Sequence, residues 1–283
     1  SAGSAGSAGS AGSVIHADKC DLTIESCIFN SAVKRLVQIA SSSATIHPDV
    51  VLTIKDSSFL NATYAAVYAA AEGSTKGRSM KVDISGSTFS GNTRGLHCSV
   101  NNSISQPLFD VDVTGCTFEG SGNLGAGISV ANNKNNVANF TLDVVNSNFL
   151  NGAGSAVKMA GFSDYATVSI TGGEISGNTV SYSGASVVQV NGPFTMDGTT
   201  VTGNSGYLVM DLENTDAVTI KNATITDNTS KNSSDTRGAI YVSANTNAKV
   251  DVSGSAFTGN TGRAGGALYV NGKNAVVNID GST

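Results

Sequence analysis

The sequence predicts an all-β protein, a right-handed parallel β-helix of about nine coils of 24–32 residues. One sequence motif recurs nine times: a β-type segment, a corner of small residues and a large apolar residue, which we call the marker. Charged residues are only 13% of the chain, and no stretch shows the 3.6-residue period of an amphipathic helix. Stacked strands are therefore favoured over helical repeats. The markers are Phe29, Phe59, Phe89, Phe118, Phe149, Ile175, Val201, Ile225 and Phe257.

Residues 1–13 stand outside this repeat, because they consist of four Ser-Ala-Gly triplets followed by Ser13. Such a tract buries no apolar surface, so we expect a flexible linker or a placeholder sequence. Residues 14–283 are expected to form the β-helix segment. Residues 279–283 repeat the start of the motif, which predicts that the segment is truncated in mid-coil.

The first segment of each repeat alternates inward aliphatic and outward polar residues, as in Val111-Asp112-Val113. Coils stacked about 4.8 Å apart place like residues above like. The marker phenylalanines should then form an internal column. Asn recurs at the third position after the marker, where it can adopt the left-handed backbone of a corner and hydrogen-bond from coil to coil. These residues are Asn92, Asn178, Asn204, Asn228 and Asn260.

The second segment of each repeat follows a Gly or Ala and also alternates. Its outward residues predict a mixed column with Tyr241 and Tyr269 on adjacent coils. Stacked tyrosines can form an aromatic platform for a sugar or a peptide. Exposed tyrosines favoured by the strand itself are the simpler interpretation. The full predicted column is Gln38, Tyr68, Ser99, Ser129, Lys158, Gln189, Asp211, Tyr241 and Tyr269.

Three successive first segments carry an outward carboxylate: Asp83, Asp112 and Asp143. Like charges about 5 Å apart repel each other, so a bound cation such as Ca²⁺ or raised pKa values are expected. Three interpretations stay open. The column is a solvated surface that discourages edge pairing, a Ca²⁺ site, or the acid pair of a polysaccharide-degrading enzyme. The solvated surface is favoured, and no Lys or Arg column is expected beside the acids.

The chain has an even number of cysteines, which permits disulfides, and Cys20–Cys27 is the first pair to test. Cys27 and Cys116 fall at the small-residue corner where other repeats have Ser, and Cys98 falls at an inward strand position. Buried, unpaired thiols are therefore the favoured interpretation. The three histidines lack the spacing of a structural zinc site, so no metal site is expected.

The net charge of −5 argues against nucleic acid as a partner, because binding phosphates requires clustered cations. No run of 18 apolar residues predicts a membrane-spanning helix. The longest polar insertions are the expected recognition loops. They are residues 72–80, 101–108, 131–139 and 229–236.

Phe257-Thr258-Gly259-Asn260 followed by Gly265-Gly266-Ala267-Leu268 resembles the repeat signature of the chlamydial polymorphic outer membrane protein (Pmp) family. Partial copies are residues 89–96 and 225–240, and the similarity extends as a pattern over residues 22–283. The resemblance implies a secreted or surface-anchored β-helix. Such proteins are often autotransporter passengers of the outer membrane that act in adhesion.

We therefore expect a non-catalytic, extracellular or cell-surface, adhesin-like domain without a cofactor. It would bind a host or cell-surface protein or a glycan through loops on a rigid rod. One alternative is a carbohydrate-active enzyme, either a polysaccharide lyase or a glycoside hydrolase, since a fold does not determine a function. The other is a structural stalk or sheath subunit that associates laterally or end to end.

Overall fold

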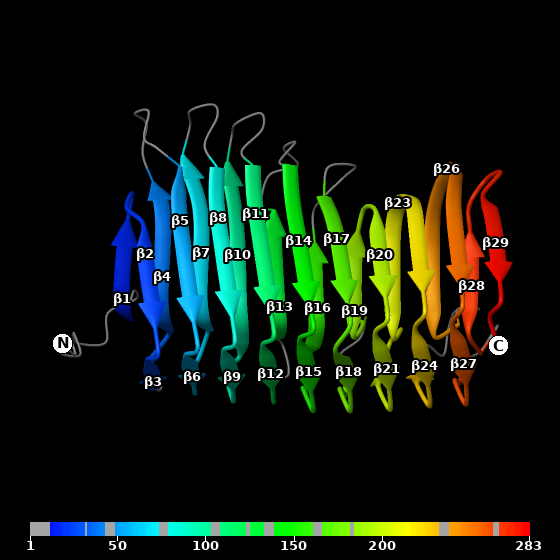
Figure 1. Ribbon diagram of the computed structural model, residues 1–283, viewed down its shortest axis with the longest axis horizontal. Coiled ribbons are helices and arrows are strands. Elements are labelled where there is room, and N and C mark those ends of the chain that lie inside the picture. Colours follow the sequence, from blue (N-terminus) through cyan, green and yellow to red (C-terminus); the bar gives the residue numbers. More distant parts are fainter. Residues whose placement is uncertain are drawn as a thin grey trace.

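The computed structural model describes residues 12–31, 33–42, 49–73, 79–102, 108–122, 125–132, 139–160, 166–181, 184–231, 238–262 and 266–283. Over these residues the chain is a parallel β-solenoid without a helix, which confirms the predicted fold class. The strands stand side by side along one long axis, from β1 at the blue end to β29 at the red end (Figure 1). In this described part, no helix is available to cross a membrane.

Each coil contributes one strand to each of three parallel ladders. The first ladder contains β2 (Leu22–Glu25), β5 (Val50–Lys55), β8 (Ser79–Ser85), β11 (Leu108–Thr114), β14 (Asn139–Val145), β17 (Ala166–Thr171), β20 (Phe194–Asp197) and β29 (Val276–Asp280). The second ladder contains β1 (Ser13–Asp18), β4 (Arg35–Ser42), β7 (Ala65–Gly73), β10 (Arg94–Asn102), β13 (Ala126–Asn132), β16 (Ser155–Ala160), β19 (Val188–Asn191) and β28 (Leu268–Asn271).

Two long strands, β23 (Met210–Lys221) and β26 (Ile240–Ser253), run through both ladders and join them into an 18-stranded sheet. A separate pair is formed by β22 (Ser205–Gly206) and β25 (Thr229–Ser230). The third, short ladder has nine three-residue strands, with a marker in the middle of each. They are β3 (Ile28–Asn30), β6 (Ser58–Leu60), β9 (Thr88–Ser90), β12 (Thr117–Glu119), β15 (Asn148–Leu150), β18 (Glu174–Ser176), β21 (Thr200–Thr202), β24 (Thr224–Thr226) and β27 (Ala256–Thr258).

The core lies between the ladders and is filled by the inward half of each alternating strand. In β8, Met80, Val82 and Ile84 are buried while Lys81 and Asp83 face outward. The five N-terminal marker phenylalanines stack as one internal column, with ring centroids 4.6–5.0 Å apart and ring planes within 10° of parallel. This spacing follows the distance between hydrogen-bonded strands, because one ring is attached to each.

A buried column of asparagine amides joins successive coils beside the short ladder. The side-chain nitrogen of Asn204 donates to the marker carbonyl of Ile175 at 2.7 Å and to Asn228 Oδ1 at 3.0 Å. Its Oδ1 accepts the backbone N–H of Asn178 at 3.0 Å. The bond to the preceding marker carbonyl and the bond from the preceding backbone N–H both recur at Asn92, Asn178, Asn228 and Asn260.

The left-handed corner lies one residue before these asparagines, so the expectation that the asparagines themselves adopt this backbone is wrong. Their side chains are needed inside the rod, where they satisfy the preceding coil. The corner is occupied by residues that tolerate a positive φ, such as Gly203 at 62°, Asp227 at 56° and Gly259 at 66°. At Gly259 a Cβ would lie 2.2 Å from Asp227 Oδ1, so stacked corners also restrict side-chain size.

A second polar column runs through the small-residue corner before each marker. The Ser87 hydroxyl accepts the backbone N–H of Ser57 at 3.1 Å and donates to the Ser85 carbonyl. Cys116 substitutes for serine here: its N–H donates to Ser147 Oγ at 3.0 Å, and its thiol donates to a nearby carbonyl. The corner thus favours small residues that can both accept and donate.

All four cysteines are free thiols in this structure, so Cys20 and Cys27 are not joined as a disulfide. Cys98 and Cys116 are buried, as the sequence predicted, whereas Cys20 is exposed and Cys27 is half-buried. Burial raises the pKa of the Cys98 thiol and raises that of Cys116 to about 11. The two buried thiols are therefore protonated at neutral pH and act as packing groups.

The asparagine column predicts a large effect of Asn204→Ala on stability. The N–H of Asn178 and the carbonyl of Ile175 would lose their partners in a buried site, so we expect the free energy of unfolding to fall by about 2–3 kcal/mol. Urea unfolding followed by circular dichroism measures this loss. The control Asn30→Ala removes an exposed amide that accepts a hydrogen bond from Asn61, and should change stability by less than about 0.5 kcal/mol. Equal losses would contradict the role of the column.

Candidate functional site

The structure places Asp83, Asp112 and Asp143 at register neighbours on β8, β11 and β14, with their side chains on the outside of the first ladder. The column continues into Ser169 and Thr195 on the next two coils. A flat strand surface presents these groups, so each carboxylate is separated from the next by one strand spacing.

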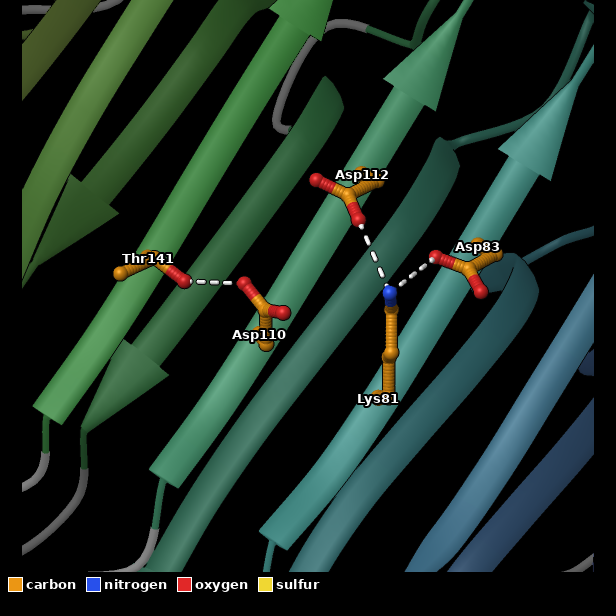
Figure 2. Close-up of polar contacts among 5 residues, drawn as sticks. All are labelled: Lys81, Asp83, Asp110, Asp112 and Thr141. Atoms are coloured by element: carbon orange, nitrogen blue, oxygen red, sulfur yellow. Dashed lines mark hydrogen bonds and ion pairs between the residues drawn. The ribbon is translucent and has the colours of Figure 1, made fainter.

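Lys81 lies between two of these acids. Its Nζ is 3.4 Å from Asp83 Oδ1 and 3.4 Å from Asp112 Oδ2 (Figure 2). The sequence predicted no Lys or Arg column beside the acids, and the structure shows one lysine instead of a column. It comes from the same strand as Asp83, two residues earlier, so alternation puts both on the outer face. The lysine ammonium supplies positive charge where a cation was expected.

The remaining neighbours make this surface acidic despite the lysine. Asp110 is the register partner of Lys81 on β11 and accepts a hydrogen bond from Thr141 (Figure 2). Burial, followed by the charge of Asp110 and the contact with Asp83, raises the pKa of Asp112 above its usual value, and Lys81 opposes this shift. We call Lys81, Asp83, Asp110, Asp112 and Asp143 the acidic surface.

The chemistry of the acidic surface is that of a partly neutralised, solvated patch. The Lys81, Asp83 and Asp112 side chains are 44%, 39% and 39% exposed, so their ion pairs contribute little to stability. Among the described residues, no group of three His, Cys, Asp or Glu side chains is arranged to hold a metal ion. These carboxylates lie along one face, whereas a glycosidase pair flanks the bond that it cleaves.

Tyr241 and Tyr269 are register partners on β26 and β28, and their rings stack with centroids 5.9 Å apart and planes at 20°. Tyr241 is only 5% exposed, whereas Tyr269 is half-buried. A ligand that approached this pair would therefore meet mainly the Tyr269 ring.

The outer face of the second ladder carries a group of residues that the sequence did not bring together. His97, and not Ser99, is the register partner of both Tyr68 and Ser129, so the predicted column is wrong at this coil. Both residues point outward, and a count from the marker does not distinguish them. The signal that could have placed His97 is the small residue before an inward aliphatic: Gly95-Leu96 aligns with residues 66–67 and 127–128.

Cationic side chains surround one tyrosine at this position. The guanidinium carbons of Arg94 and Arg35 lie 4.7 Å and 5.3 Å from the Tyr64 ring centroid. Arg35 also lies 4.0 Å from the Tyr68 centroid, and the His97 ring meets Tyr64 edge-on at 5.6 Å. Such contacts attract cations to the negative face of the ring. We call Arg35, Tyr64, Tyr68, Arg94 and His97 the Tyr64 cluster.

His97 is buried and lies 3.0 Å from Ser129 through Nδ1. Burial, together with the positive charges of Arg94 and Arg35, lowers its pKa to about 4 against the opposing hydrogen bond to Ser129. At neutral pH the imidazole is therefore uncharged, and the positive charge of the cluster comes from its arginines.

The predicted recognition loops lie mainly outside the described residues, which omit 74–78, 103–107, 133–138 and 232–236 within them. Comparisons of the chain with protein-family models and with curated proteins give no match. The resemblance to the chlamydial family stays a prediction from the repeat motif.

Asp112 and Asp251 lie in the same outward column of the first ladder, and their pKa shifts predict opposite effects of pH on stability. The pKa of Asp112 is raised, so its contribution to stability is present below the unfolded value of about 3.9 and is lost as pH rises through the folded value. Hydrogen bonds from Lys249 and Asn278 lower the pKa of Asp251, so its contribution is present above the unfolded value and is lost on acidification.

At about pH 7, Asp112→Asn should therefore leave the free energy of unfolding unchanged or raise it, and Asp251→Asn should lower it. Denaturant unfolding of both variants at about pH 7 and about pH 3 measures the difference, which should disappear in acid. A loss of stability at neutral pH for Asp112→Asn as large as that for Asp251→Asn would contradict the raised pKa.

The Tyr64 cluster predicts a pH dependence that belongs to His97. The unfolded histidine binds a proton near pH 6.5 and the folded one near pH 4. The free energy of unfolding should therefore fall by on the order of 3 kcal/mol as the pH is lowered from 6.5 to 4. His97→Phe should remove this part of the pH profile, whereas Tyr64→Phe, which keeps the imidazole, should retain it. Urea unfolding across this range tests both variants, and an unchanged profile in His97→Phe would refute the assignment.

Proposed function

We propose that this chain is a non-catalytic, surface-exposed or secreted β-helix that binds a cell-surface protein or a glycan along a rigid rod. The observation that carries the proposal is the coil-to-coil bonding of buried Asn and Ser side chains, which holds outward residues in fixed columns. Preorganised side chains lose little conformational entropy when a partner binds. A rod of this kind is suited to recognition of an extended partner.

The two outward ladder faces support binding by their charge. The acidic surface lies on the first ladder at β8, β11 and β14, and the arginines of the Tyr64 cluster lie on the second ladder at β4 and β10. Charge separated onto different faces gives a partner a preferred side and orientation. The adhesin-like role and the extracellular location are part of this proposal.

The proposal is tested by measuring binding and cleavage together. Immobilised full chain should retain glycans or intact cells in a biolayer or flow-cell assay, and should release no new reducing ends from the polysaccharides that it binds, with or without Ca²⁺. The matched variant carries Asp83→Asn, Asp112→Asn and Asp143→Asn. Cleavage by the wild type that this variant lacks would identify the chain as an enzyme.

Two further outcomes would also reject the proposal. A chain that retains no cells, glycans or proteins but forms concentration-dependent filaments in light scattering would act as a structural subunit. Binding that is abolished only by unfolding, and is equal for every ligand presented, would show nonspecific adsorption. Specific, saturable binding without cleavage supports the proposed function.

A further inference from the structure

We propose that the Tyr64 cluster is a binding site for the anionic groups of an acidic glycan, that is, its carboxylates or sulfates. This inference rests on the proposed function and names the class of partner. It is drawn from the convergence of cations on one ring, from a guanidinium N–H without a hydrogen-bond partner and from the spacing of the arginines along the rod.

Three cations converge on Tyr64, although the whole chain has a net charge of −5. Lys34 Nζ lies 5.7 Å from the ring centroid, in addition to the two arginines at 4.7 Å and 5.3 Å. Within the described part of the chain, no ion pair joins Arg35 or Arg94 to a carboxylate. The positive charge of the arginines is therefore stabilised by aromatic rings. The Nη1 group of Arg94 also donates to the Tyr64 carbonyl at 3.5 Å, and that of Arg35 donates to Gln38.

Arg35 has a donor that nothing in the described structure satisfies. Its Nη1 donates to Gln38 Oε1 at 2.9 Å, but its Nε is buried and has no hydrogen-bond partner. A buried donor without a partner is costly, and the cost is larger for a charged group. A carboxylate or sulfate reaches the Nε–H edge once the Arg35 side chain turns to expose it, and binding in the two-point geometry preferred by arginine would then remove this cost.

The two arginines lie on strands that are two ladder steps apart. Arg35 begins β4, Arg94 begins β10, and β7 pairs with both strands, so their backbones are separated by about 9.6 Å along the rod. A linear polymer whose sugars carry repeated negative charges can meet both cations while lying along the columns. At each point, the planar fork of the arginine can bind two oxygens of one carboxylate or sulfate.

A glycan is favoured over nucleic acid by the charge on the other faces. A duplex needs many phosphate contacts, and the acidic surface, which begins at β8 on the coil of Arg94, repels such a dense polyanion. An acidic glycan is a narrower chain with fewer charges, so two arginines can match a single short segment. An acidic peptide is the remaining alternative and forms one arm of the test.

The test measures binding of the full chain to short oligosaccharides by isothermal titration calorimetry. The probes are a sulfated oligosaccharide, a polyuronate oligosaccharide, a neutral glucan of equal length and an oligoglutamate peptide. Wild type should bind one or both acidic oligosaccharides, and binding should weaken with salt. The double variant Arg35→Gln/Arg94→Gln should weaken binding by at least about tenfold, because charge-assisted bonds at two points are lost.

Two controls separate the site from general electrostatics and from folding. Lys249→Gln removes one cation of an exposed ion pair on another coil and should change affinity by less than about twofold. Arg35→Lys/Arg94→Lys keeps the charge but loses the planar fork, so its affinity should fall between wild type and the Gln variant. In wild type, the Arg35 Nε–H resonance should shift during titration, which a merely structural arginine would not show.

The outcomes distinguish this inference from the proposed function. Unchanged affinity in a folded double Gln variant would show that the glycan binds elsewhere, and the proposed function would stand. Equal or stronger binding of oligoglutamate or of the neutral glucan would overturn the assignment to an acidic glycan. A wild type that binds none of the probes, nor any cell or glycan, would reject both.

Discussion

The spacing between hydrogen-bonded coils is the constraint on which the rest of this structure depends. A polar group inside the rod can find a protein partner only on its own coil or on an adjacent one, because the rod has no other interior surface. The Asn204 amide meets this requirement by bonding to the coils before and after it, and the Ser87 hydroxyl does so at the other corner. These bonds fix register, and register places like side chains above like.

The same constraint creates the main electrostatic problem of the rod. Stacking puts Asp83 beside Asp112, and the acids cannot separate because their strands are paired. Lys81 relieves this repulsion from the neighbouring outward position. Burial and Asp110 still raise the pKa of Asp112, whereas the pKa of Asp251, in the same column, is lowered by hydrogen bonds from its neighbours. The acids are therefore aligned in one column, but their pKa values are shifted in opposite directions by their different neighbours.

The Tyr64 cluster shows the opposite use of stacking. Two tyrosines of one coil hold arginines from the coils before and after it, and they do so on the second ladder, whereas the acidic surface lies on the first. His97 stays neutral there because burial and two guanidinium groups disfavour a further charge. A rigid rod with a cationic, aromatic patch on one face and acids on another has the asymmetry expected of a recognition surface.

The sequence by itself determined the period, the alternation and the identity of the internal columns. Asp83, Asp112 and Asp143 could be aligned in advance because each lies six residues before its marker, along a segment without insertions. Only the tertiary structure decided the second face, since the distance from marker to second segment varies between coils. His97 was therefore placed beside Tyr68 by strand pairing alone, and Lys81 reached two acids through a side-chain geometry that no spacing encodes.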